Sequence, residues 1–216
     1  MDIELLNVQT MKQFHGRYQG HAAQNAYAEN PGFGLLHYAL IRNMRPEHVL
    51  CLGSRGGFIP AFCALACHDN GKGFVDFVDA GFNANHPKGW AGVGLWSSKN
   101  FNAARHFGKL ADFIAVHVEL SRDFCERTET QYEYIHVDAD HSYEGVKDDF
   151  DIWWPRLLPG GIVAFHDATR KRIHTKLWGD IGVARFLDEI HLQRGLTVFE
   201  LQFGQGLAMI QKGLSG

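Results

Sequence analysis

The stretch EHVLCLGSRGG, residues 47 to 57, changes from an apolar run to a glycine-rich loop within a few positions. A short apolar run that ends in glycine is typical of a buried parallel strand. The chain continues as GFIPAFCALACHDNG, residues 57 to 71, with helical spacing and with Pro60 in the first turn, where proline is tolerated. Residues 47–71 are therefore predicted to form a strand, a glycine loop and a helix.

The rest of the chain repeats this alternation of strand and helix. Further strands are predicted at 73–80, 113–120, 133–138 and 161–167, with a PGG turn before the last of them and an antiparallel pair within 197–212. Helices are predicted at about 7–27, 32–44, 99–111, 143–157 and 182–193, and a glycine-rich loop at 81–98. Alternation of this kind is typical of a parallel sheet with helices on both faces.

We therefore expect an α/β fold: a Rossmann-like, doubly wound, mostly parallel sheet with an antiparallel C-terminal strand. The length of 216 residues suits one domain. Within this domain, residues 1–33 are predicted to form an N-terminal helical cap and residues 34–216 the Rossmann-like core.

Composition limits the classes of partner. The net charge is −3 with 13 histidines and no basic stripe, so nucleic acid is not expected as a partner. No window approaches the ~18 uninterrupted apolar residues of a membrane span, so we expect a soluble, cytoplasmic protein without a membrane partner. Cys63 and Cys67 have the spacing of a metal pair on a helix, but we interpret them as small core residues. Whether the chain forms a homo-oligomer is left open.

The glycine loop and Asp79 indicate a nucleotide-like ligand. In a sheet of this winding, ligands bind beyond the carboxyl ends of the strands. Glycine lets the backbone approach a ligand, and the following helix offers free N–H groups. Asp79 lies 22 residues after Gly57, near the spacing of a carboxylate that binds a ribose diol; a helix-capping or solvated aspartate is the alternative, and Asp76 in mid-strand is a weaker candidate. The loop does not match G-x-G-x-x-G, which weighs against a nicotinamide dinucleotide.

A second polar group follows the strand in YIHVDADHSYEGVKDDF, residues 134 to 150. Asp138, Asp140 and His141 fall within four positions there. Carboxylates crowded at the end of a core strand repel one another and lose hydration, which costs free energy. His136 in mid-strand is interpreted as a packed residue, and the aspartates of DDFD (148–151) as a mostly solvated helix face.

These segments together resemble a known enzyme family. VLCLGSRGG (49–57), VDFVD (75–79) and YIHVDADHSYEGVKDDFDIWWPRLLPGGIVAFHDA (134–168) are similar to class I S-adenosylmethionine-dependent methyltransferases. The resemblance extends over roughly residues 34 to 210. It is closest to the metal-dependent O-methyltransferases that act on catechol, caffeoyl-coenzyme A or macrolide sugars. It implies S-adenosyl-L-methionine as cofactor, a divalent metal, magnesium or manganese, and a small hydroxylated acceptor such as a sugar or glycoside.

The resemblance also implies roles for individual residues. Asp79 would hold the ribose hydroxyls, and Ser121 would contact the adenine. The residues implied for cofactor binding are Gly53, Ser54, Gly56, Gly57, Asp79, Ser121 and Asp138. The residues implied for the metal are Asp138, His166 and Asp167. His141 would be the general base, for which a pKa near neutrality is suited, and Asp140 is a second candidate base or orients His141.

The sequence departs from this family at three positions. Relatives usually carry an acidic residue at the position of Cys51, a glycine at Arg55 and an aspartate at His166. A cofactor-binding protein without transferase activity is therefore one alternative. A metal-dependent hydrolase is another, although such an enzyme needs no ribose site.

Overall fold

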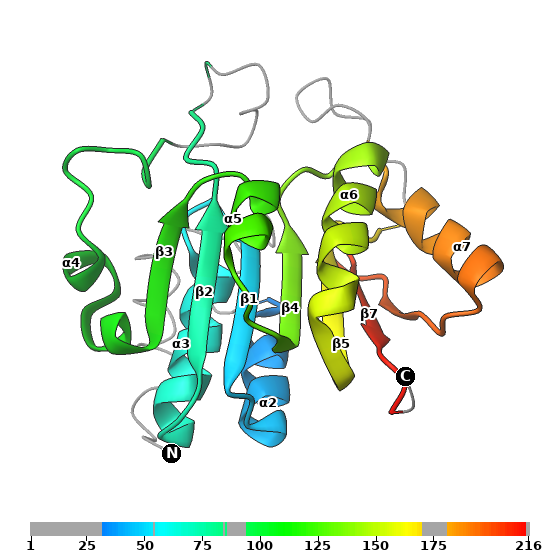
Figure 1. Ribbon diagram of the computed structural model, residues 1–216, viewed down its shortest axis with the longest axis horizontal. Coiled ribbons are helices and arrows are strands. Elements are labelled where there is room, and N and C mark those ends of the chain that lie inside the picture. Colours follow the sequence, from blue (N-terminus) through cyan, green and yellow to red (C-terminus); the bar gives the residue numbers. More distant parts are fainter. Residues whose placement is uncertain (1–31, 54, 84, 86–93, 170–180, 215–216) are drawn as a thin grey trace.

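The strands of the protein form one seven-stranded sheet in the order β3-β2-β1-β4-β5-β7-β6 (Figure 1). The computed structural model describes residues 32–53, 55–83, 85, 94–169 and 181–214. The strands are β1 (His48–Gly53), β2 (Phe74–Asp79), β3 (Ile114–Val118), β4 (Tyr132–Asp138), β5 (Leu157–His166), β6 (Phe199–Leu201) and β7 (Leu207–Gln211). Strands β1 to β5 pair in parallel, and β7 runs antiparallel to both β5 and β6. The predicted fold class is confirmed.

Helices cover both faces of the sheet, each over its own hydrophobic cluster. One face packs against α2 (Gly34–Met44), α3 (Phe58–Asn70), α4 (Ala103–Phe107) and the 3-10 helix η3 (Gly108–Phe113). The other packs against α5 (Ser121–Arg127), α6 (Tyr143–Trp153), the 3-10 helix η4 (Trp154–Arg156) and α7 (Val183–Arg194). In Figure 1, α5 and α6 lie in front of the strands, and α2 and α3 lie behind them.

The pairing register brings the polar strand ends to one edge of the sheet. Gly53, the last residue of β1, is paired with Asp138, the last residue of β4. The parallel neighbour of β4 on its other side is β5, which ends at His166. Strand β2 lies on the other side of β1 and ends at Asp79. The residues singled out from the sequence therefore end four strands in a row, β2-β1-β4-β5.

Several predicted boundaries differ from the structure. The helix expected at 99–111 is a short α4 followed by η3, because Gly108 breaks the α-helix with a φ of +59°. Helix α6 ends at Trp153, since Pro155 follows it. The PGG expected as a turn is a bulge within a longer β5: Tyr132 of β4 pairs with Leu157, and Tyr134 pairs with Ile162.

Part of the prediction falls outside the described residues. The helix at 7–27 and most of the cap at 1–33 lie there, as do Ser54 and most of the loop at 81–98. Among the described residues, none of the helices has both the length and the apolar character that crossing a bilayer requires.

Candidate active site

The ends of β4 and β5 bring together four buried titratable side chains, Asp138, His141, His166 and Asp167. The Nδ1 atom of His166 lies 3.2 Å from Oδ1 of Asp138 and 3.3 Å from Oδ1 of Asp167. His141 lies between the same two carboxylates. Its Nε2 is 3.3 Å from Oδ1 of Asp138, and its Nδ1 forms an ion pair with Oδ2 of Asp167. Two carboxylates are thus bridged by two imidazoles.

This proximity changes the acid–base behaviour of the cluster. Burial alone would lower the pKa of His141, but hydrogen bonds to Asp138 and Asp167 raise it to about 10. The pKa of His166 is likewise lowered by burial but raised overall to about 9, chiefly by the charge of Asp138. Burial would raise the pKa of Asp167, but hydrogen bonds to the two histidines hold it well below its usual range. The two carboxylates therefore favour the charged form of both imidazoles, whereas a general base is suited by a pKa near neutrality.

The backbone around the cluster is held tightly. Asp167 has a φ of +56°, a left-handed conformation that is uncommon for residues other than glycine, although aspartate adopts it more readily than most. The N–H of Gly182 donates to the carbonyl of His141 at 2.8 Å, and a side chain at Gly182 would collide with Tyr143. The segment before α7 therefore packs directly against the turn that carries His141.

The cluster has the donor atoms of a cation site. One ligand atom each from Asp138, His141 and Asp167 lie within 4.8 Å of one another. Two carboxylates with imidazole suit a first-row transition metal such as manganese, whereas magnesium prefers oxygen ligands. The residues therefore fit a divalent cation. His141, predicted as the base, stands as close to the carboxylates as His166, predicted as a ligand.

Asp140 lies apart from this cluster. It is exposed at the start of α6, where its Oδ1 accepts the N–H of Ser142 at 2.9 Å. Ser142 itself caps α6, since its hydroxyl accepts the N–H of Gly145 at 3.0 Å. The carboxylate of Asp140 thus supports the helix start, and its role as a second base stays a prediction.

The glycine loop runs beside Asp138. Gly53 has a φ of +74°, and a Cβ there would collide with the carbonyl of Asp138, so glycine is required by conformation and by space. Gly57 also has a positive φ, +81°, and precedes α3 as its N-cap. Arg55 adopts a φ of +35° although it is not glycine, and its side chain is exposed. The bulky cation at this position therefore points to solvent.

Two side chains that the sequence does not single out hold this loop in place. The indole Nε1 of Trp96 donates to the carbonyl of Arg55 at 3.1 Å, and its ring covers Gly57. The Nε2 of His106 lies 3.2 Å from the carbonyl of Gly56. Trp96 lies in a glycine-rich segment without periodicity, so no pattern in the sequence points to it.

Asp79 lies at the same edge of the sheet. Its Oδ1 accepts the N–H of Gly81 at 2.7 Å. Burial raises its pKa to about 6, and the charge of Asp138 contributes in the same direction. The ionisation of Asp79 is therefore coupled to the charge of the cluster at the end of β4, and at neutral pH this carboxylate remains mostly ionised.

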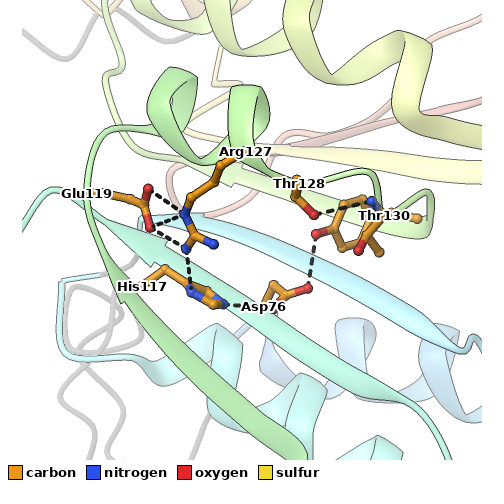
Figure 2. Close-up of polar contacts among 7 residues, drawn as sticks. Asp76, His117, Glu119, Arg127, Thr128 and Thr130 are labelled. Atoms are coloured by element: carbon orange, nitrogen blue, oxygen red, sulfur yellow. Dashed lines mark hydrogen bonds and ion pairs between the residues drawn. The ribbon is translucent and has the colours of Figure 1, made fainter.

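Asp76 serves a different part of the molecule. Figure 2 shows it in mid-strand, beside His117 and the Glu119–Arg127 ion pair. The Nε2 of His117 lies 2.8 Å from Oδ1 of Asp76, and the hydroxyl of Tyr132 donates to Oδ2 at 3.0 Å. Both oxygens of Asp76 are thus engaged within the sheet, which agrees with its lower rank as a ribose ligand.

Ser121 and Asp149 join α5 to α6. The hydroxyl of Ser121 accepts the indole N–H of Trp153 at 2.9 Å and is hydrogen-bonded to the carboxylate of Asp149. Its donor and acceptor capacity is therefore directed toward α6, and adenine binding by Ser121 stays a prediction. Asp149 is buried, so it is an exception to the solvated face expected for residues 148–151.

The remaining departure from the family, Cys51, lies in the core. Cys51 is fully buried on β1, with its Sγ 3.9 Å from Sγ of Cys63. Cys63 and Cys67 both belong to the hydrophobic cluster around α3, as interpreted from the sequence. His136 is packed in mid-strand as expected, but its Nε2 lies 3.8 Å from Oδ2 of Asp138. The spacing of two residues along one strand signals this closeness, because such residues share a face.

One curated protein is similar in sequence to nearly the whole of this chain. The chain is 26% identical over 224 aligned positions to the uncharacterized protein y4gI of Sinorhizobium fredii, across 99% of this chain and 23% of that protein. It therefore spans about a quarter of the length of this curated relative.

Two solved structures share the fold. The O-methyltransferase from Bacillus cereus, in complex with S-adenosylhomocysteine, is 18% identical with a TM-score of 0.65, over 98% of this chain and 94% of that one. The O-methyltransferase TomG from Streptomyces achromogenes, involved in tomaymycin synthesis and in complex with S-adenosylmethionine, is 15% identical with a TM-score of 0.64, over 93% and 89%. Residues 50–168 match the family model described as a methyltransferase domain. Since this match includes more than half of the chain, with the glycine loop and the cluster at the ends of β4 and β5, the protein belongs to this family of methyltransferases.

Proposed function

We propose that the protein transfers the methyl group of S-adenosylmethionine to a hydroxyl oxygen of a small acceptor, such as a sugar or glycoside, at a site that also holds a divalent cation. The observation that carries this proposal is the convergence of Asp138, His141, His166 and Asp167 beside the glycine loop. Membership of the methyltransferase family supports group transfer over hydrolysis. The oxygen acceptor is supported by the O-methyltransferases of the same fold.

The cofactor is proposed to lie across the ends of β1, β2 and β3. The glycines at 53, 56 and 57 allow the backbone to approach its methionine and ribose portions, and α3 offers N–H groups at its start. Asp79 accepts hydrogen bonds from the ribose hydroxyls, and Ser121 contacts the adenine. Ser54, which lies outside the described residues, is included by resemblance. S-Adenosylmethionine supplies the electrophilic methyl group.

Asp138, His166 and Asp167 are proposed to hold the cation. When bound, a divalent cation neutralises the two carboxylates and lowers the pKa of an acceptor hydroxyl. His141 is proposed to remove the acceptor proton, because its ring is oriented by the same carboxylates. A base must begin unprotonated, so the raised pKa of His141 has to fall; positive charge beside the two carboxylates works in that direction.

The test combines calorimetry with a transfer assay. We expect S-adenosylmethionine to bind with or without manganese, and we expect methyl transfer to a panel of glycosides and catechols only when manganese is present. Asp167→Asn should bind the cofactor as the wild type does but lose transfer. Full activity after exhaustive chelation would remove the metal from the proposal, and failure to bind S-adenosylmethionine would remove the function itself.

A further inference from the structure

The sheet face that packs against α2 carries a line of buried polar rings leading to Asp138. Side chains alternate along a strand, so Tyr134, His136 and Asp138 of β4 share this face. His37 of α2 packs against them: its ring centroid lies 4.7 Å from that of His136, at an interplanar angle of 74°. The Nδ1 of His37 lies 2.6 Å from the hydroxyl of Tyr134. His37 and His136 are both fully buried.

The register leaves room for these rings. His136 is paired with Cys51 on β1 and with Ala164 on β5, and both neighbours are small. A core that needed only volume here would use apolar rings, since a buried polar group left short of hydrogen bonds costs about 1–3 kcal/mol. Nε2 of His37 is such a group, because it has no hydrogen-bond partner among the described residues. Burial keeps the pKa of His37 well below its ordinary value, so this ring is neutral.

The two oxygens of Asp138 face different groups. Oδ1 lies 3.3 Å from Nε2 of His141 and 3.2 Å from Nδ1 of His166, within the cluster proposed to bind the cation. Oδ2 lies 3.8 Å from Nε2 of His136, which precedes Asp138 by two residues on β4. This separation is longer than a hydrogen bond but within ion-pair range, so the ring presents its polar edge to the second oxygen of Asp138. Outer partners of a carboxylate ligand bias its orientation and strongly affect metal affinity.

We propose that His136 is a positioning residue that orients Asp138 for cation binding, and that His37, anchored by Tyr134, keeps the ring of His136 in place. This inference rests on the cation site proposed above. It explains why polar rings, and not apolar ones, fill the space between α2 and β4.

The test is manganese binding measured by calorimetry. His136→Phe keeps a ring and removes both nitrogens, whereas His136→Gln keeps a donor. We expect His136→Phe to weaken manganese binding by about 10–100-fold, as for loss of an outer-shell partner, and His136→Gln to recover most of this loss. Binding of S-adenosylhomocysteine should not change. His117→Phe is the matched control, because it removes another histidine–aspartate contact, at 2.8 Å, from a different part of the sheet.

Each outcome decides between the proposals. If folded His136→Phe binds manganese as the wild type does, the positioning role is overturned and the cation site stands. An equal loss in the Phe and Gln variants assigns His136 to packing alone and also overturns it. A wild-type protein that binds no manganese overturns both the cation site and the positioning role. If His136→Phe does not fold, His136→Met replaces it in the same comparison with His136→Gln.

Discussion

Replacing Asp149 with asparagine should stabilise the protein above pH 7. The carboxyl group is buried on α6 and its pKa is raised from 3.8 to about 7, first by desolvation and further by the charges of Asp140 and Asp148. Between these two values the folded protein keeps a proton that the unfolded chain has released, so wild-type stability falls as the pH rises through this range. A rise of about 3 units corresponds to about 4 kcal/mol at 1.36 kcal/mol per unit.

Asparagine removes this charge and keeps an oxygen for the hydroxyl of Ser121. Its amide N–H groups also need partners, which offsets about 1–3 kcal/mol of the gain. We therefore expect a net stabilisation of about 1–3 kcal/mol at pH 8. At pH 4 the carboxyl is protonated and the gain is absent, so the cost of the amide should leave the variant about 1–3 kcal/mol less stable than wild type. Urea unfolding of Asp149→Asn and wild type should be measured at intervals from pH 4 to pH 8. The free energy of unfolding of the variant, relative to wild type, should rise up to about pH 7 and then level off.

The exposed neighbour Asp148 provides a matched control, since Asp148→Asn makes the same change of charge at a side chain that is 72% exposed. Its stability difference from wild type should stay small at every pH. The buried carboxyl of Asp149 is not the source of the pH dependence if Asp149→Asn differs from wild type by the same amount at pH 4 and pH 8, or if Asp148→Asn shows the same pH dependence.

Three further predictions concern the proposed site. Asp79→Ala should weaken binding of S-adenosylhomocysteine by about 1–3 kcal/mol in calorimetry, because a charged acceptor for the ribose is lost, whereas Asp76→Asn should bind normally; unchanged affinity of Asp79→Ala would refute the ribose assignment. His141→Ala should lower turnover by about 10²–10⁴-fold with cofactor binding intact, and a loss below about tenfold with a wild-type pH–rate profile would exclude it as the base. Gly53→Ala should lower the free energy of unfolding by more than about 1 kcal/mol, because the left-handed φ of +74° disfavours a side chain and the new Cβ meets the carbonyl of Asp138; denaturation at the wild-type midpoint would contradict this.

The topology could be predicted because the residue types in the sequence mark where the strands end. β1, β2 and β4 are short apolar runs closed by Gly53, Asp79 and Asp138, and parallel strands place such ends at one edge of a sheet. One rule about sheet edges was therefore enough to gather most of the candidate site. The same rule does not predict the roles of Trp96 and His37. Trp96 contacts Arg55, and His37 contacts His136; each pair joins segments that are far apart in the chain and share no sequence pattern.

Asp149 and His136 differ from those two, because periodicity does locate them. Val146, Asp149, Phe150 and Trp153 follow the i, i+3, i+4, i+7 spacing of a buried helix face, and all four are buried. His136 stands two residues before Asp138, on the same face of β4. The sequence places Asp149 in a mostly solvated helix face, because polar residues are usually assigned to the surface, whereas it predicts His136 to be packed but assigns it no partner. A charged or polar side chain that follows the periodicity of the core is better predicted to be buried. The free-energy cost of its desolvation must then be offset by a specific partner. For Asp149 that partner is Ser121, and for His136 we infer that it is Asp138.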